Sequence, residues 1–270
     1  GCCHFGVAIL EEGYRLRQGG IKGSIVVLGG IYPGQVMEIF SLDLTPVVFD
    51  IESARMIDSA AASLGAVKKI HVKIDTGMGR LGVPVAMAVP FFEELKGLGN
   101  ISVEGVLSHF AESESEDRSF TQRQLKEFTS VVDMIKGMGF APDIVDIANS
   151  AAAVDIPESH LGMVRPGLML YGSYPSPRLR ASIDLRPVME LKTRIMYLKA
   201  VPSGYPVSYG RTFVTKRESL IATLPIGYAD GLPRRLSGSG EALVGGLRVP
   251  LAGRVCMDLV MCDVTDVPGV

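Results

Sequence analysis

Short apolar runs alternate with amphipathic stretches along the first two thirds of the chain, as is typical of βα units in a parallel sheet. The clearest amphipathic stretch predicts a helix from Thr121 to about Lys136. Its apolar residues have the spacing of one helical face: Leu125, Phe128, Val131, Val132 and Ile135. The apolar runs predict strands, each placed to within a few residues, at 3–8, 24–28, 46–49, 69–75, 103–108, 144–147 and 163–170.

This order of elements favours a (β/α)8 TIM-type barrel, which needs eight strands and about 250 residues. The seven predicted strands end near Gly172, one unit short of a closed barrel. Because the chain opens on the strand-like segment CCHFGVA, we expect the first βα unit to lie upstream of Gly1. An open doubly wound sheet is the competing interpretation.

The pattern changes after Tyr171 to β-branched segments punctuated by Gly and Pro, which indicates an antiparallel β domain. We therefore predict an α/β barrel domain over residues 1–178 and a C-terminal β domain over residues 179–270. Because the chain stops at Val270 directly after a strand-like segment, we expect this second domain to be incomplete.

The composition limits the possible partners. With 47% hydrophobic and 21% charged residues and a net charge of -2, the 270-residue chain is expected to be soluble, with neither nucleic acid nor membrane as a partner. It has no recognisable export signal, so a cytoplasmic location is expected. The spacing of Cys2, Cys3, Cys256 and Cys262 predicts neither a disulfide framework nor a metal site.

The segment IHVKIDTGMGRLGV carries the most concentrated polar chemistry. Strand alternation puts Lys73 and Asp75 on the face opposite the apolar residues, which in a barrel is the inner face. The Gly77 and Gly79 turn would let a ligand approach the backbone, with Arg80 reaching in. A buried salt-bridge layer beside a tight turn is the alternative.

Other polar residues follow the next predicted strands. His109 ends one strand, where a structural hydrogen-bonding role is the common alternative to acid–base chemistry. Asn149 and Ser150 open a short helix that could hold an anion such as phosphate, although taken alone an ordinary helix N-cap is the simpler explanation.

Arg165 is predicted to lie on the last barrel strand, with the backbone amides of Gly167 and Leu168 just beyond it. A lone arginine at such a position would most simply be paired with a carboxylate. In the β domain, loops place Tyr209 and Tyr228, and the segment GRVCMDLVMCDV carries Met257 and Asp258 on a strand or at its end.

The words KIDTGMGRLG, HFA, NSAA, VRPGLMLYG, VSYGRTF, LPIGYADG and GRVCMD resemble the alanine racemase family in order and spacing, across essentially the whole chain. The resemblance implies an isomerase that uses pyridoxal 5'-phosphate (PLP) on a barrel joined to a β domain. It also implies a homodimer with a shared active site, and interconversion of L- and D-alanine that supplies D-alanine for cell-wall peptidoglycan.

The resemblance further implies a two-base mechanism on an amino acid held as a PLP aldimine. Tyr209, supplied by the partner subunit, matches one base, with His109 and Arg165 linked to it. Arg165 also matches the residue that faces the pyridine nitrogen. The cofactor-binding positions match Asn149, Ser150, Arg165, Gly167, Leu168 and Tyr228. The substrate-binding positions match Arg80, Met257 and Asp258, and Lys73 matches a lysine that can be carbamylated.

One departure concerns the second base. The family's Schiff-base lysine belongs to a Lys-Ala-Asn/Asp-Ala-Tyr-Gly-type motif on the first barrel strand, and this sequence contains no such motif. We expect that lysine to lie outside the given chain and do not assign its role to Lys73. The alternatives are a PLP decarboxylase, a non-catalytic PLP-carrier barrel, and a metal hydrolase, for which His71-Val72-Lys73 does not supply the expected HxH pair.

Overall fold

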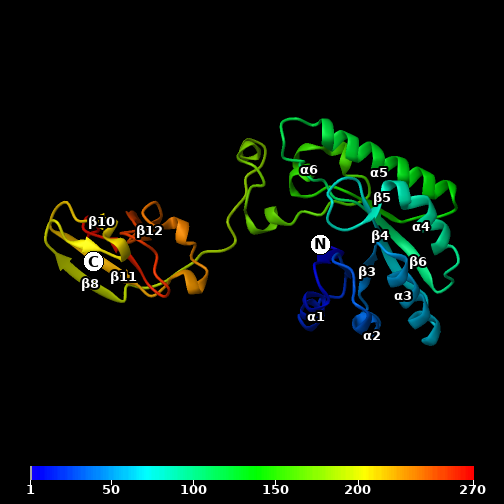
Figure 1. Cartoon of the computed structure of the whole chain (residues 1–270), viewed down its shortest axis with the longest axis horizontal. Helices are drawn as coiled ribbons and strands as arrows, with labels where there is room; N and C mark the ends of the chain where they lie inside the picture. The colour runs from blue at the N-terminus through cyan, green and yellow to red at the C-terminus, as the bar shows by residue number, and fades with distance from the viewer. Residues whose placement is uncertain (1) are drawn as a thin grey trace. The chain divides into compact units, whose positions relative to one another are not determined.

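A computed structural model describes residues 2–270, and the chain divides into two compact units, Gly1–Val188 and Met189–Val270 (Figure 1). The first contains the parallel sheet and all the α-helices of the described residues, and the second contains antiparallel sheets. Each unit is described by itself below. The predicted boundary between residues 178 and 179 stays a prediction.

The first unit is built on a parallel sheet whose strands follow the order β1-β2-β3-β4-β6-β7, with the short β5 paired to β4. The strands are β1 His4–Val7, β2 Ser24–Val27, β3 Thr45–Val48, β4 Lys68–Asp75, β5 Val83–Pro84, β6 Ile101–Leu107 and β7 Ile144–Asp146. Along this path each strand lies beside its neighbour in sequence. A doubly wound sheet instead reverses its strand order at a switch point, so the barrel-type interpretation is confirmed.

The last predicted strand, 163–170, is wrong in extent. Only Met163 pairs with the sheet, through a single parallel bridge to Asp146, and the chain then forms a 3-10 helix, η4, at Leu168–Tyr171. Pro166 has no backbone N–H to donate, so it cannot extend the ladder. Arg165 therefore lies in an irregular segment after the bridge and not on a strand.

The helices follow the strands as expected for βα units. They are α1 Leu10–Gln18, α2 Val36–Ser41, α3 Ile51–Ser63, α4 Ala88–Leu95, α5 Ser119–Gly137 and α6 Ser150–Asp155. The remaining 3-10 turns of this unit are η1 Pro33–Gln35, η2 Val85–Met87, η3 Pro157–Ser159 and η5 Pro177–Ala181. The predicted 121–136 helix is confirmed by α5, whose residues Phe128, Val131, Val132 and Ile135 are buried.

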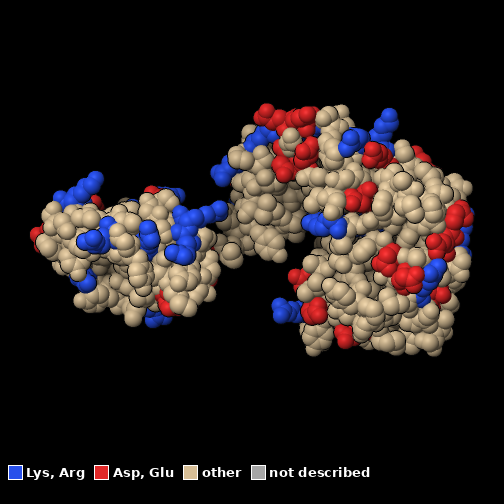
Figure 2. Space-filling model, in the orientation of Figure 1, with Lys and Arg blue, Asp and Glu red and all other residues tan. Residues whose placement is uncertain are grey.

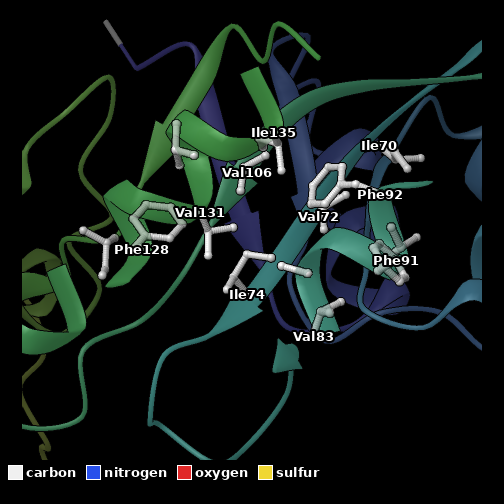
Figure 3. Packing of buried hydrophobic residues seen from close by; sticks show 14 of the residues in the cluster. Ile70, Val72, Ile74, Val83, Phe91, Phe92, Val106, Phe128, Val131 and Ile135 are labelled. Carbon is white, nitrogen blue, oxygen red and sulfur yellow. The ribbon is translucent and has the colours of Figure 1, made fainter. Parts of the chain in front are cut away.

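The sheet has an apolar layer on each face. On the helix side, Ile70, Val72 and Ile74 of β4 belong to one cluster with Phe92 and Phe128 from α4 and α5 (Figure 3). On the other side a smaller cluster gathers Val26, Val47 and Leu107 from β2, β3 and β6. Because Val47 pairs with His71 and Leu107 with Lys73, the polar residues of β4 share this inner face.

The second unit consists of small antiparallel sheets, which confirms the predicted β domain. The sheet orders are β14-β11-β8, β10-β9 and β12-β13. The elements are β8 Tyr197–Val201, β9 Pro206–Val207, η6 Tyr209–Arg211, β10 Phe213–Val214, β11 Ser219–Leu224, η7 Tyr228–Asp230, η8 Arg234–Leu236, β12 Glu241–Val244, β13 Leu247–Pro250 and β14 Val260–Asp263. Apolar residues such as Leu224, Val249, Val260 and Cys262 form its core.

Charges of both signs are interspersed over the visible face of the first unit (Figure 2). Among residues 2–270, no helix is long and apolar enough to cross a bilayer. Three positively charged side chains, those of Lys73, Arg80 and Arg165, lie near one another beside the inner face of the parallel sheet.

Candidate active site

Lys73 lies at the centre of the inner face of the sheet. It pairs in register with Leu107, which in turn pairs with Asp146, so these residues occupy one level across β4, β6 and β7. Only 5% of Lys73 is exposed. Burial, together with the nearby guanidinium groups of Arg80 and Arg165, lowers the pKa of Lys73 to about 8. A substantial fraction of this amine is therefore neutral slightly above neutral pH.

Asp75 stabilises the turn that follows β4. Its carboxylate accepts the backbone N–H of Gly77 at 2.9 Å and that of Gly79 at 3.1 Å. Gly77 has φ +124, and a Cβ there would approach the Phe120 ring to 2.8 Å, so the turn requires glycine. No ion pair joins Asp75 to Lys73 among the described residues. The turn leads to Arg80, whose side chain is exposed.

Arg165 is fixed by side chains and backbone of neighbouring strand ends. Its Nε–H donates to the carboxylate of Asp146, which is fully buried, and one terminal N–H donates to the carbonyl of Ser108. The other terminal nitrogen lies 3.3 Å from Nδ1 of His109. These contacts leave further guanidinium N–H groups available to a ligand, because the group carries more donors than it uses here.

His109 is held as a neutral ring. Burial and the positive charges of Arg165, Arg80 and Lys73 lower the pKa of His109 to about 4. A guanidinium can only donate, so Nδ1 of His109 accepts from Arg165 and the ring proton lies on Nε2. The carbonyl of His109 accepts from Gln124 Nε2 at 3.2 Å, which fixes the backbone beneath the ring.

The start of α6 lies beside the segment that follows Arg165. Ser150 Oγ accepts the backbone N–H of Gly167 at 2.9 Å and that of Met169 at 3.4 Å. The Asn149 side chain caps α6 by accepting the N–H of Ala152 at 3.1 Å, as an ordinary N-cap does. Ser150 and Gly167 thus lie together, and Leu168, half exposed, is the next residue.

In the second unit, two loops that carry candidate residues are joined by backbone hydrogen bonds. The N–H of Tyr228 donates to the carbonyl of Cys256 at 3.0 Å, and the N–H of Ala229 donates to that of Met257 at 2.9 Å. A Cβ on Gly227 would lie 2.1 Å from the carbonyl oxygen of Met257, so this approach requires glycine. Tyr228 and Met257 are therefore neighbours, and Asp258 follows in the bend before β14.

The Tyr209 loop joins the same group. Ser208 Oγ donates to the carbonyl of Arg254 at 2.7 Å, which ties this loop to the one that holds Met257. Ser208 has φ +66 and Arg211 has φ +50, a conformation that non-glycine residues seldom adopt. Tyr209 itself is 69% exposed. A strained backbone thus presents its phenol to the surroundings of the unit.

Two residues of the arrangement were missed by reasoning from the sequence. Asp146 ends β7 on its inner face, and Ser108, also buried, directly follows β6 and supplies a carbonyl to Arg165. The expectation that a lone arginine pairs with a carboxylate pointed to a partner for Arg165 without identifying it. Alternation shows that Asp146 faces away from the apolar Val145 and Ile147, but only the register with Leu107 and Lys73 shows that this is the inner face.

Comparison with known proteins gives one consistent result. Residues 1–175 match the family described as "Alanine racemase, N-terminal domain", and residues 188–270 match "Alanine racemase, C-terminal domain". A curated alanine racemase of Halothermothrix orenii is 48% identical over 98% of this chain and 70% of its own length. One from Geobacter sp. strain M21 is 44% identical over 98% of this chain and 72% of its own length.

Solved structures agree. An alanine racemase of Clostridium difficile 630 superposes with a TM-score of 0.92 at 35% identity, covering 100% of this chain and 71% of that one. A Bacillus anthracis alanine racemase described with bound L-Ala-P superposes with a TM-score of 0.87 at 36% identity, covering 97% of this chain and 68% of that one. The decarboxylase, carrier and hydrolase alternatives find no support in these matches, and the chain belongs to the alanine racemase family of isomerases.

Proposed function

We propose an alanine racemase reaction in which L- and D-alanine are interconverted with PLP by two bases, of which this chain supplies Tyr209 as one. The observation that carries the proposal is the fixed Arg165, held by Asp146, Ser108 and His109 with N–H groups to spare. The base for the other face of the substrate is assigned to no residue of this chain, since its lysines do not lie in the family's motif.

The described residues fit the polar groups of PLP. Its phosphate is an anion, and the Ser150 hydroxyl contacts the N–H of Gly167, which lies two residues after the cationic Arg165 and next to Leu168. Its ring nitrogen is an acceptor, and Arg165 has N–H groups to donate. When bound, PLP supplies an electron sink that makes the proton on Cα of the amino acid acidic. Asn149 supports this region as the cap of α6, and Tyr228 is proposed to contact the phosphate.

Tyr209 must lose its proton to act as a base, and the free phenol has a pKa of about 10. In our proposal the neutral His109 donates its Nε2–H to the phenolate oxygen of Tyr209 from a partner subunit, and Arg165 behind it adds positive charge. Both interactions favour the phenolate. Tyr209 would thereby remove or return a proton at Cα near neutral pH.

The substrate carboxylate is assigned to Arg80, whose guanidinium follows the rigid Asp75 turn. Lys73 is proposed to react as a neutral amine with CO2, forming a carbamate and releasing a proton, and the carbamate would then orient Arg80. The lowered pKa of Lys73 supplies that neutral amine. Met257 and Asp258 of the partner's β unit are proposed to close the pocket, which requires a homodimer. We also propose, from the family resemblance, that the enzyme acts in the cytoplasm and supplies D-alanine for peptidoglycan.

The charge of Arg165 gives the decisive experiment. A guanidinium does not release its proton near neutral pH, so it leaves the ring nitrogen unprotonated and the electron sink moderate. Arg165→Glu should lower racemisation of L-alanine and raise transamination, whereas Arg165→Lys, which keeps a cation, should lower racemisation with little change in the product ratio. An unchanged ratio in Arg165→Glu would remove the reason for this assignment.

A further inference from the structure

Asp146 is a fully buried carboxylate outside every sequence segment that suggested the function. It ends β7 on the inner face of the sheet, level with Leu107 and Lys73, and 0% of it is exposed. Its Oδ1 accepts the Nε–H of Arg165, and its side chain is 1% exposed against 15% for that of Arg165. The pair is thus shielded from solvent, where electrostatic interactions are strongest.

The guanidinium of Arg165 needs a negatively charged partner, because nearby cations repel it. Lys73 and Arg80 carry like charge, and the pKa of Lys73 is lowered by burial first and then by the positive charges of Arg80 and Arg165. The Arg165 backbone is held by one hydrogen bond, from its N–H to the carbonyl of Ala148 at 2.9 Å, which does not by itself fix the direction of the side chain. Asp146 supplies the attraction that keeps the guanidinium among these like charges.

The pair has no evident purpose in stability alone. Apolar residues of similar volume often replace a buried ion pair without loss of stability, because desolvating both charges is costly. For Asp146 this desolvation cost is only partly offset, because its Oδ2 has no hydrogen-bond partner among the described residues. A carboxylate retained under these conditions is better explained by the orientation it imposes on its partner.

We propose that Asp146 is the positioning residue for Arg165, fixing the guanidinium toward the bound ring and offsetting part of its charge. The inference rests on the proposed function, because it is Arg165 that is assigned to the ring nitrogen. Asp146 touches neither substrate nor cofactor in this account. It acts through Arg165 and, beyond it, through His109.

The charged groups around the Arg165–Asp146 pair determine how the reaction rate should depend on pH. Asp146 faces Arg165, Lys73 and His71, and His71 in turn lies 3.5 Å from the carboxylate of Glu104, which also binds Lys69. His109 faces Arg165, Arg80 and Lys73. Removing the negative charge of Asp146 leaves these cations uncompensated, which favours the negatively charged form of a base that contacts His109.

The test compares wild-type holoenzyme with two variants of the same position. Asp146→Asn keeps an acceptor for Arg165 but removes the charge, and should reduce kcat about 10- to 100-fold through misplacement of the guanidinium. It should also weaken PLP binding, measured by fluorescence titration, by about 10-fold. The acid limb of the kcat/KM profile should move down by about half a pH unit to one unit.

Asp146→Glu restores the charge on a longer side chain, so kcat should fall less and the acid limb should stay at the wild-type pH. It also serves if Asp146→Asn does not fold. Asp58→Asn is the matched control, because Asp58 accepts hydrogen bonds from Asn100, just before β6 begins, whereas Arg165 is held just after β6 ends. It should alter neither PLP affinity nor the acid limb.

Folded Asp146→Asn enzyme with wild-type PLP affinity and an unmoved acid limb would overturn the inference, leaving Asp146 a structural residue. An acid limb displaced equally in Asp146→Glu would also overturn it, since charge would not be the cause. Wild-type enzyme that binds PLP but does not racemise alanine would instead refute the proposed function. In that case weaker PLP binding by Asp146→Asn still supports Asp146 as the anchor of Arg165.

Discussion

The two units hold their candidate residues in opposite ways. In the barrel unit, Lys73, His109 and Arg165 are largely buried, and side-chain contacts fix Arg165 and His109. In the β unit, Tyr209 and Met257 are more than half exposed, and backbone hydrogen bonds fix the loops that carry them. Burial shifts pKa values in the first unit. The second unit presents its candidate groups outward, so a substitution of such a group should change activity without changing the stability of the protein.

The largest effect that this comparison predicts is on Tyr209. Tyr209→Phe removes only the hydroxyl of an exposed side chain, so kcat should fall about 10²- to 10⁴-fold, the usual contribution of a general acid–base group. The melting temperature should stay within the error of wild type, because exposed substitutions seldom change stability. Stopped assays with D-amino-acid oxidase and differential scanning calorimetry check the two halves of the prediction.

Mixing variants sharpens the same contrast between units. If Tyr209 acts in the partner's site, a Tyr209→Phe chain and an Arg165→Ala chain, each inactive alone, should form heterodimers with one intact site and regain up to about half the activity per dimer. Arg165→Ala mixed with Asp146→Asn is the control, since both changes lie in the barrel unit. Verified Tyr209→Phe/Arg165→Ala heterodimers without activity would refute the shared site.

The contact between the Tyr228 loop and the Met257 loop of the β unit should be disrupted by a substitution at Gly227. An alanine there places its Cβ 2.1 Å from the carbonyl oxygen of Met257, so the two loops must separate. We expect Gly227→Ala to destabilise the protein by about 1–3 kcal/mol and to weaken substrate binding. Gly34→Ala, with nothing within 4 Å of the added Cβ, should behave as wild type in denaturant unfolding and in KM. A wild-type KM for Gly227→Ala would show that the loop contact does not shape the pocket.

Lys73 tests the cost of burial in the barrel unit. Its folded pKa is about 8 against 10.5 for the free group, so the unfolded chain binds more protons between these values and stability rises with pH across that window. Below pH 8 the folded protein bears the full free-energy cost of holding Lys73 protonated in a buried position. In CO2-free buffer at pH 7, Lys73→Met should therefore stabilise the protein by about 1–3 kcal/mol, a gain that shrinks as pH rises above 8 and disappears above 10.5.

Bicarbonate provides the control for Lys73. A carbamate would convert the cation into an anion beside Arg80 and Arg165, so wild type should gain stability with bicarbonate while Lys73→Met should not. Thermal melts across pH, with and without bicarbonate, measure both effects. Lower stability of Lys73→Met in CO2-free buffer would contradict a cost of burying the amine.

The sequence predicted the elements whose side-chain period is unambiguous. Alternation in HVKID placed Lys73 on the inner face, and the helical spacing around Phe128 predicted α5, because both patterns follow directly from backbone geometry. The extent of the 163–170 segment was wrong because apolar residues there resemble a strand while Pro166 and Gly167 end the pairing.

The site was predicted less completely than the fold. Residue types and order indicated Arg165 and His109, but the contact between them joins residues far apart in sequence and depends on how β6 and the segment after β7 lie. Asp146 escaped notice because a carboxylate at a strand end has many ordinary roles, and only the register with Leu107 shows it facing inward. Strand pairing, which local pattern does not specify, made the difference.

The smallest predicted effect concerns an ion pair of the β unit. Arg248 lies 2.9 Å from Glu241 across the β12–β13 hairpin, with side chains 74% and 52% exposed. Water screens both charges, so a double-mutant cycle with Arg248→Ala and Glu241→Ala should give a coupling of about 0.2–1 kcal/mol that fades in molar salt. The buried Arg165–Asp146 pair should show a larger coupling that salt hardly changes, because solvent ions do not reach it. Equal couplings, or equal salt dependence, would mean that burial does not distinguish the two units electrostatically.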